Sequence, residues 1–91
     1  MTIRWSPEAA TDFGAIVEYI RRQNPSAANR VAHSVYEAIM SLERFPHQGR
    51  EGRQSGTREL VLAPLPFVVV YRIKEEFVEI ARVLHGSQRW P

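Results

Sequence analysis

The fold is decided by a run of β-branched and aromatic residues, Phe67-Val68-Val69-Val70-Tyr71-Arg72-Ile73-Lys74. This composition is typical of a central β-strand. A turn at 63–66 separates the run from a preceding strand candidate at 58–62, and a short polar turn at 75–76 leads into another at 77–84. Three strands joined by short turns predict a small antiparallel sheet.

Before the sheet, the apolar residues recur with the period of a helix. Ser6 as N-cap and Pro7 in the first helical position predict a helix start, and Asn24-Pro25 is expected to stop that helix. Ser26 is expected to cap a second helix that ends near Phe45-Pro46. Two amphipathic helices joined by so few residues predict an antiparallel helical hairpin.

The order of the elements predicts an α+β fold. With a short strand candidate at 2–5, the order is β-α-α-β-β-β, and the 91 residues are expected to form one domain, 1–91. We expect the helical hairpin to pack on one face of the small antiparallel sheet and to leave the other face open to a partner. The polar stretch 47–57 contains three glycines and is expected to be a functional or mobile loop.

Composition excludes several classes of protein. Hydrophobic residues make up 44% of the chain and charged residues 24%, which is ordinary for a soluble globular protein. No apolar run approaches the roughly 18 residues of a membrane span, and the first residues do not resemble a secretory signal, so a cytoplasmic location is expected. The chain lacks cysteine, its three histidines are widely spaced, and no metal or cofactor is expected.

The basic residues are almost all arginine. Of the 12 basic residues only Lys74 is lysine, and Arg44, Arg50, Arg53 and Arg58 fall in one 15-residue stretch. Because the planar guanidinium group of arginine donates paired hydrogen bonds to carboxylates and phosphates, the excess of arginine fits an acidic partner or a phosphate backbone. A GC-rich genome would also produce it. We expect the guanidinium groups to converge into a cationic surface for a larger macromolecule.

Arg58, Arg82 and His85 are candidates for a phosphodiester-cleaving site. Arginines stabilise the developing charge on phosphorus, and histidine transfers protons near neutral pH. Strand alternation places Arg82 on the face of Val78 and Ile80 and His85 on the opposite face, so the two meet only if the strand ends or bulges. In the alternative, structural interpretation, the strand arginines pair with carboxylates such as Glu59 or Glu79.

Motifs at both ends of the chain and in the strands carry a family likeness. They are Trp5-Ser6-Pro7-Glu8-Ala9, Phe45-Pro46, the strand segments 58–60, 66–73 and 80–86, and the closing Arg89-Trp90-Pro91. In this order and spacing the sequence resembles the RelE/ParE toxin family. The resemblance implies the toxin of a type II toxin–antitoxin pair and a cognate antitoxin as its partner.

The resemblance leaves two targets open. A ParE-like toxin inhibits DNA gyrase by binding, and this is the function we predict, with Arg50, Arg53, Arg89 and Trp90 as target-binding residues. A RelE-like toxin cleaves mRNA on the ribosome, and the catalytic residues would then be Arg58, Arg82 and His85. A degenerate, non-toxic relative is a third possibility. Trp90 is also expected to fold the tail back onto the core as an apolar plug.

Overall fold

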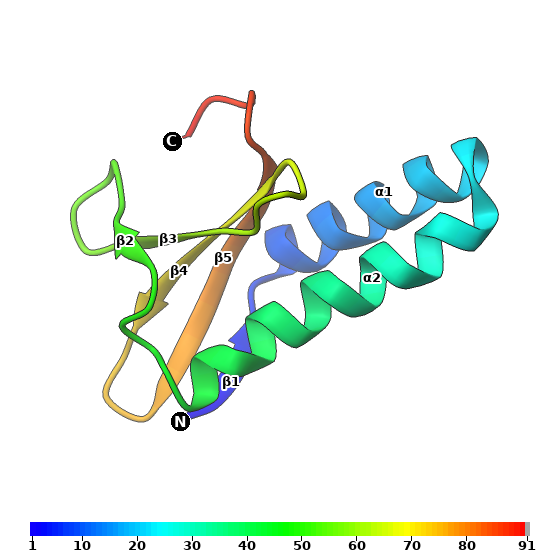
Figure 1. Cartoon of the computed structure of the whole chain (residues 1–91). Coiled ribbons are helices and arrows are strands. Elements are labelled where there is room, and N and C mark those ends of the chain that lie inside the picture. The colour runs from blue at the N-terminus through cyan, green and yellow to red at the C-terminus, as the bar shows by residue number, and fades with distance from the viewer. Residues whose placement is uncertain (91) are drawn as a thin grey trace.

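The computed structural model describes residues 1–90, so Pro91, which closes the C-terminal motif, lies outside the described residues. The helices pack side by side against one face of a twisted sheet, and the C-terminal tail turns back above the opposite side (Figure 1). The elements are β1 (Thr2–Trp5), α1 (Pro7–Gln23), α2 (Pro25–Met40), the 3₁₀ turn η1 (Ser41–Glu43), β2 (Arg50–Glu51), β3 (Arg58–Val61), β4 (Phe67–Ile73) and β5 (Phe77–His85). The predicted α+β class and its β-α-α-β-β-β order are confirmed.

The sheet is mixed rather than wholly antiparallel. Its strand order is β1-β5-β4-β3-β2, and β1 pairs with β5 in parallel. The helical hairpin returns the chain to its starting end, where the Met1 amino group donates to the Glu43 carbonyl oxygen at 3.1 Å. The two-residue strand β2 lies within the predicted loop 47–57 and pairs with the first half of β3.

Both helices begin with a side-chain cap. The Ser6 hydroxyl accepts from the Ala9 N–H at 3.0 Å, as the sequence predicts. The cap of α2 is Asn24 rather than the predicted Ser26, because the Asn24 Oδ1 accepts from the Ala27 N–H at 3.3 Å. Pro25 then occupies the first helical position, where a missing N–H is tolerated. The same Asn24-Pro25 pair therefore ends α1 and starts α2.

A β-bulge at Ala81 exchanges the two faces of β5. Tyr71 of β4 pairs with Ile80 and Val70 pairs with Arg82, which leaves Ala81 without a partner residue on β4. The prediction that Arg82 shares the face of Ile80 is therefore wrong. Arg82 lies on the face opposite the helices, and His85 lies on the helix side. The bulge moves both residues, so they remain on opposite faces.

The two faces of the sheet are covered differently. The main core lies between the sheet and the helices and contains Ala9, Val35, Ile39, Leu42, Phe67, Val69, Tyr71, Val78, Ile80 and Val83. On the other face, which we call the open face, a smaller buried cluster of Val70, Ala81 and Leu84 packs against Trp90 of the tail. Trp90 thus covers the sheet as the predicted plug.

Candidate functional site

The open face carries one row of residues that crosses four strands. Arg50 of β2 pairs with Glu59 of β3, Glu59 with Val70 of β4, and Val70 with Arg82 of β5. Paired residues on neighbouring strands point to the same side of a sheet. Arginines from distant parts of the sequence therefore gather on this face, with a carboxylate between them.

Glu59 is the centre of the charged groups at the β2 end of the row. Only 3% of its surface is exposed. Its carboxylate accepts from Arg50 Nη2 at 3.0 Å and from the Arg53 N–H at 3.1 Å, and Arg53 Nε lies 3.9 Å away. Burial alone would raise the pKa of Glu59, but these bonds and charges more than offset it and hold the pKa below the ordinary value.

This arrangement predicts acid sensitivity. A carboxyl with a lowered pKa in the folded state stabilises the fold above its ordinary value of 4.5, and the stabilisation is lost as the pH falls through the folded-state pKa. Glu59→Gln should lower the free energy of unfolding by about 1–2 kcal/mol at pH 7. Urea titrations at several pH values should show the difference from wild type shrinking below pH 4.5. A difference independent of pH would contradict the role of the carboxylate charge.

Arg82 is tied to the first helix. Its Nε and Nη2 donate to the two carboxylate oxygens of Asp12 at 2.7 and 3.0 Å, and the Val83 N–H donates to the same carboxylate at 3.0 Å. The hydrogen bonds that Arg82 donates to Asp12 raise the pKa of Arg82 above its ordinary value. This guanidinium is therefore committed to a structural contact. Arg72 similarly pairs with Glu79 at 3.4 Å.

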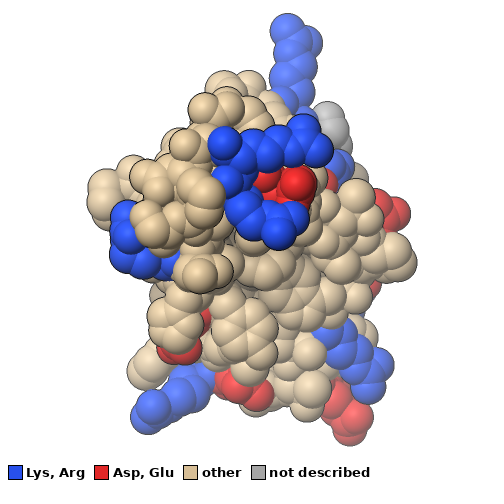
Figure 2. All heavy atoms as spheres, turned by 90° about the vertical axis from the view of Figure 1, so that its right-hand side faces the viewer, with Lys and Arg blue, Asp and Glu red and all other residues tan. Residues whose placement is uncertain are grey.

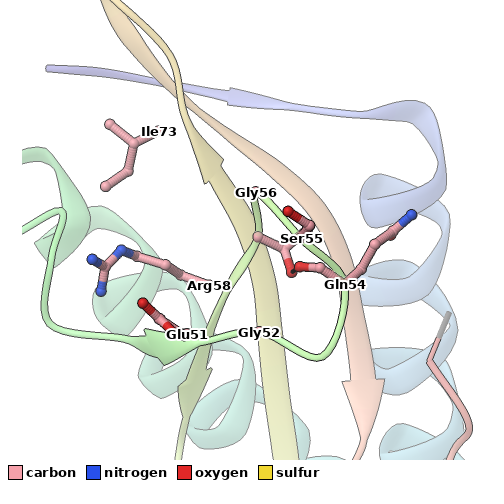
Figure 3. Close-up of a pocket in the computed structure, with 8 residues that line it drawn as sticks. Glu51, Gly52, Gln54, Ser55, Gly56, Arg58 and Ile73 are labelled. Atoms are coloured by element: carbon pink, nitrogen blue, oxygen red, sulfur yellow. Dashed lines mark hydrogen bonds between the residues drawn. The ribbon is translucent and has the colours of Figure 1, made fainter.

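Arg58 holds the polar loop that precedes β3. Its Nη1 donates to the Gly49 carbonyl oxygen at 2.6 Å and to the His47 carbonyl oxygen at 3.4 Å. The residue also lines a pocket of about 340 Å³ formed by the β2–β3 loop. Figure 3 shows its side chain extending between Ile73 and Glu51, away from Gln54 at the loop. In the sheet, Arg58 pairs with Tyr71 near one end of β4, whereas His85 pairs with Phe67 at the other end, and Arg82 pairs with Val70 on the opposite face.

His85 ends β5 on the helix side. Its ring meets Phe67 edge to face, with centroids 6.1 Å apart. Its Nδ1 accepts from the Ser87 N–H at 3.2 Å and lies 2.8 Å from the Ser87 hydroxyl. The three residues predicted for catalysis therefore occupy three separate positions.

The predicted target-binding residues lie closer together. Arg53 and Trp90 line the same small pocket on the open face, Arg50 binds Glu59 at its edge, and Arg89 is exposed on the tail beside Trp90. Four guanidinium groups of this face lie beside carboxylates: Arg72 pairs with Glu79 and Arg82 with Asp12, while Arg50 and Arg53 share the one carboxylate of Glu59. The expected cationic surface is therefore interleaved with acidic groups. On the side of the helices, Figure 2 likewise shows basic atoms surrounding acidic ones.

The sequence named Glu59 and Glu79 as carboxylates that could pair with the strand arginines, and both do so, but it did not identify Asp12 as the partner of Arg82. In the sequence, Glu59 alternates with the apolar Leu60, which places the two side chains on opposite faces of the strand. Asp12 stands out only as the one aspartate of the chain. Within residues 1–90, no group of three potential metal ligands occurs. In the same part of the chain, the helices are too short or too polar to cross a membrane.

Comparison with known proteins identifies the class. A family model described as the ParE toxin of the type II toxin–antitoxin system parDE matches residues 3–90. The chain therefore belongs to the ParE toxin family, and it is a toxin of the ParE/RelE superfamily.

Relatives and solved structures agree with this assignment. The chain is 43% identical over 89 residues to "Putative toxin Y4kP" of Sinorhizobium fredii, which covers 98% of this chain and 92% of the relative. It matches a structure described as the chromosomal ParDE system of P. aeruginosa with a TM-score of 0.86, 27% identity and coverage of 93% and 95%. It also matches the toxin–antitoxin complex RelBE2 of Mycobacterium tuberculosis with a TM-score of 0.66, 27% identity and coverage of 92% and 95%.

Proposed function

We propose that this chain inhibits DNA gyrase by binding to it in the cytoplasm and that a cognate antitoxin neutralises the toxin. The observation that carries the proposal is the separation of Arg58, Arg82 and His85. Arg82 is bound to Asp12 and Arg58 to loop carbonyls, while His85 lies on the other side of the sheet from Arg82. An activity based on binding needs no convergence of these groups.

Cleavage of RNA places stricter demands on geometry. A general acid or base has to lie within hydrogen-bond reach of the reacting group, and the cations have to surround the phosphate. A site built from Arg82 and His85 would require the Asp12–Arg82 contact to break and the end of β5 to turn over. The arrangement therefore supports binding over catalysis.

The open face is the surface that we propose for the target. Arg53 and Arg50 share the single carboxylate of Glu59, and the exposed fractions of their side chains are 54% and 58%. Arg89 and Trp90 extend this surface along the tail. An aromatic ring beside arginines is the composition of many binding hot spots.

Purified toxin tests the proposal directly. We expect it to inhibit DNA supercoiling by gyrase in vitro and to leave mRNA intact in a translating ribosome extract. Codon-positioned mRNA cuts with full gyrase activity would overturn the proposal and establish the ribonuclease alternative. An isolated chain that affects neither assay and permits normal growth would identify a non-toxic relative.

Two variants separate binding from proton transfer. Arg53→Gln should weaken gyrase inhibition about fivefold or more, since it removes an exposed guanidinium but keeps the backbone N–H that binds Glu59. His85→Ala should change inhibition less than about twofold, because a binding toxin needs no acid or base. Dose–response curves in the supercoiling assay measure both effects. Abolition of toxicity by His85→Ala alone, with the fold intact, would contradict this interpretation.

A further inference from the structure

The connection between the two helices forms a polar end of the molecule. We call residues 21–30, where α1 ends and α2 begins, the hairpin tip (Figure 1). Its only apolar residues are one proline and two alanines, and it contains no aspartate or glutamate. Its neutral polar residues are all exposed, and they are Gln23, Asn24, Ser26 and Asn29. A partner that binds here therefore has to be recognised by polar and charged groups.

Three arginines give the hairpin tip a positive charge. Arg21 and Arg22 lie in the last turn of α1, and Arg30 follows the first turn of α2. The only acid within residues 18–30 is Glu18, one turn before the tip, so this stretch carries a net charge of +2, as large as the formal net charge of the whole chain. Figure 2, which faces the side of the tip, shows basic atoms around acidic ones there. The tip is therefore a cationic end of the protein.

Glu18 binds two of the guanidinium groups without using all of their donors. Arg21 donates to the Glu18 carboxylate through Nε at 3.1 Å and through Nη2, and Arg22 donates through Nε at 3.4 Å. The side chains of Arg21 and Arg22 are 64% and 76% exposed. Within residues 1–90 Arg30 forms no ion pair and donates only to the Ser26 carbonyl oxygen, at 3.3 Å. All three guanidinium groups therefore keep N–H donors for an external anion.

The helix dipoles do not account for all of this charge. Arg21 and Arg22 stabilise the carbonyl end of α1, as basic residues in a last turn do. The N-terminus of α2 lies at the same tip, however, so the opposite partial charges of the two helix ends largely cancel there. Arg30 lies near the positive end of α2, where a cation gains nothing from the dipole. The excess positive charge is therefore available to a partner.

We propose that the hairpin tip binds the phosphate backbone of duplex DNA. Guanidinium groups donate charge-assisted hydrogen bonds to phosphate oxygens, and neutral amide and hydroxyl side chains donate to them as well. A protein partner needs an apolar anchor, and unpaired bases need an aromatic ring on which to stack; residues 21–30 contain neither. The choice of DNA over an RNA duplex rests on the proposed function, because gyrase acts on duplex DNA.

Fluorescence anisotropy of a labelled DNA duplex, titrated with the toxin alone, tests the proposal. Three phosphate contacts predict that the logarithm of the association constant falls with the logarithm of the salt concentration with a slope of about −2.7. Affinity should therefore fall about fortyfold between about 25 and about 100 mM NaCl. Absence of binding at the lower salt concentration would overturn the proposal. So would equal or tighter binding of a single strand of the same length, or equal affinity for polyglutamate.

Matched variants locate the contact. Arg21→Gln and Arg30→Gln should each reduce the slope by about 0.9, so that affinity falls only about twelvefold over the same range of salt. Arg44→Gln, which removes an arginine that lies over the Phe45 ring outside the tip, should leave the slope unchanged. Glu18→Gln should tighten DNA binding about twofold at the lower salt concentration, because it removes the one acid beside the tip. A slope that neither tip variant changes would overturn the proposal, as would weaker binding of the Glu18→Gln variant.

This assay contains no gyrase, so its outcome is independent of the supercoiling assay. Absence of DNA binding overturns the inference even if the toxin inhibits gyrase. DNA binding with the expected slope and variant effects supports the inference even if gyrase proves not to be the target.

Discussion

Asp12→Ala is expected to lower the free energy of unfolding by about 2–3 kcal/mol. The carboxylate accepts two bonds from Arg82 and one from the Val83 N–H. Removing it leaves a partly buried guanidinium without its partner and a strand N–H without an acceptor. The estimate is below that for a fully buried ion pair, because the side chains of Arg82 and Asp12 are 32% and 15% exposed.

The reason for so large an effect is the position of Asp12 in the fold. The pairing of β1 with β5 stops at Ile80, so the second half of β5 has a free outer edge. At the start of that edge, the backbone N–H of Ser6 donates to the Ile80 carbonyl oxygen and its hydroxyl donates to the Ala81 carbonyl oxygen. Further along the same edge, the Asp12 carboxylate accepts from the Val83 N–H and so joins α1 to the sheet.

Urea denaturation measures the loss, with Glu8→Ala as the matched control. Glu8 lies in the first turn of the same helix and should cost about 0.5 kcal/mol through its interaction with the helix dipole. Asp12→Asn keeps an oxygen acceptor for Val83 and should fall between the two. Equal effects of Asp12→Ala and Glu8→Ala would show that the contact with Arg82 does not stabilise the sheet edge.

Local features of the sequence predicted most of the fold. Ser6-Pro7 and Asn24-Pro25 act within one helical turn, so the chain itself carries the signals that start and stop α1. Local sequence also predicts the strands, since a β-branched run such as 67–73 favours extended backbone. The parallel pairing of β1 was not predicted, because it depends on where the helical hairpin returns the chain.

The candidate site was less predictable because it depends on contacts across the sheet. No local signal marks Ala81 as a bulge, yet the extra residue moves Arg82 to the open face and His85 to the helix side. Asp12 and Arg82 are separated by 70 positions, and alternation gives no information about such a pair. The sequence could supply the residue types of the site but not which carboxylate neutralises each arginine.

Tyr71→Phe is expected to lower the free energy of unfolding by about 2–4 kcal/mol. The Tyr71 ring is fully buried, and its hydroxyl donates to the Pro46 carbonyl oxygen at 2.7 Å and accepts from the Gly49 N–H at 2.9 Å. Burial raises the pKa of this hydroxyl, so it stays protonated and keeps its donor role. Phenylalanine fills the same space but leaves both backbone groups without a partner.

Tyr71→Phe should also make the loop that follows η1 more mobile. Arg58 binds the Gly49 and His47 carbonyl oxygens, so Tyr71 and Arg58 hold the same short segment from two sides. Hydrogen exchange should therefore accelerate at the Gly49 N–H, with little change in the helices. Tyr36→Phe is the matched control, because that ring is 46% exposed and should cost about 0.5 kcal/mol or less.

Gly49→Ala tests the same contact from the opposite side. A Cβ at this position would lie 2.6 Å from the Tyr71 hydroxyl oxygen, so the added methyl has to push the hydroxyl away from the loop. In the Tyr71→Phe background the hydroxyl is already absent, and the methyl meets one fewer atom. The two substitutions together should therefore destabilise the protein less than the sum of their separate effects. Full additivity would mean that the added methyl is opposed by the Tyr71 ring carbon at 2.8 Å and the Glu59 carbonyl oxygen at 3.0 Å, and that the hydroxyl does not fix the loop.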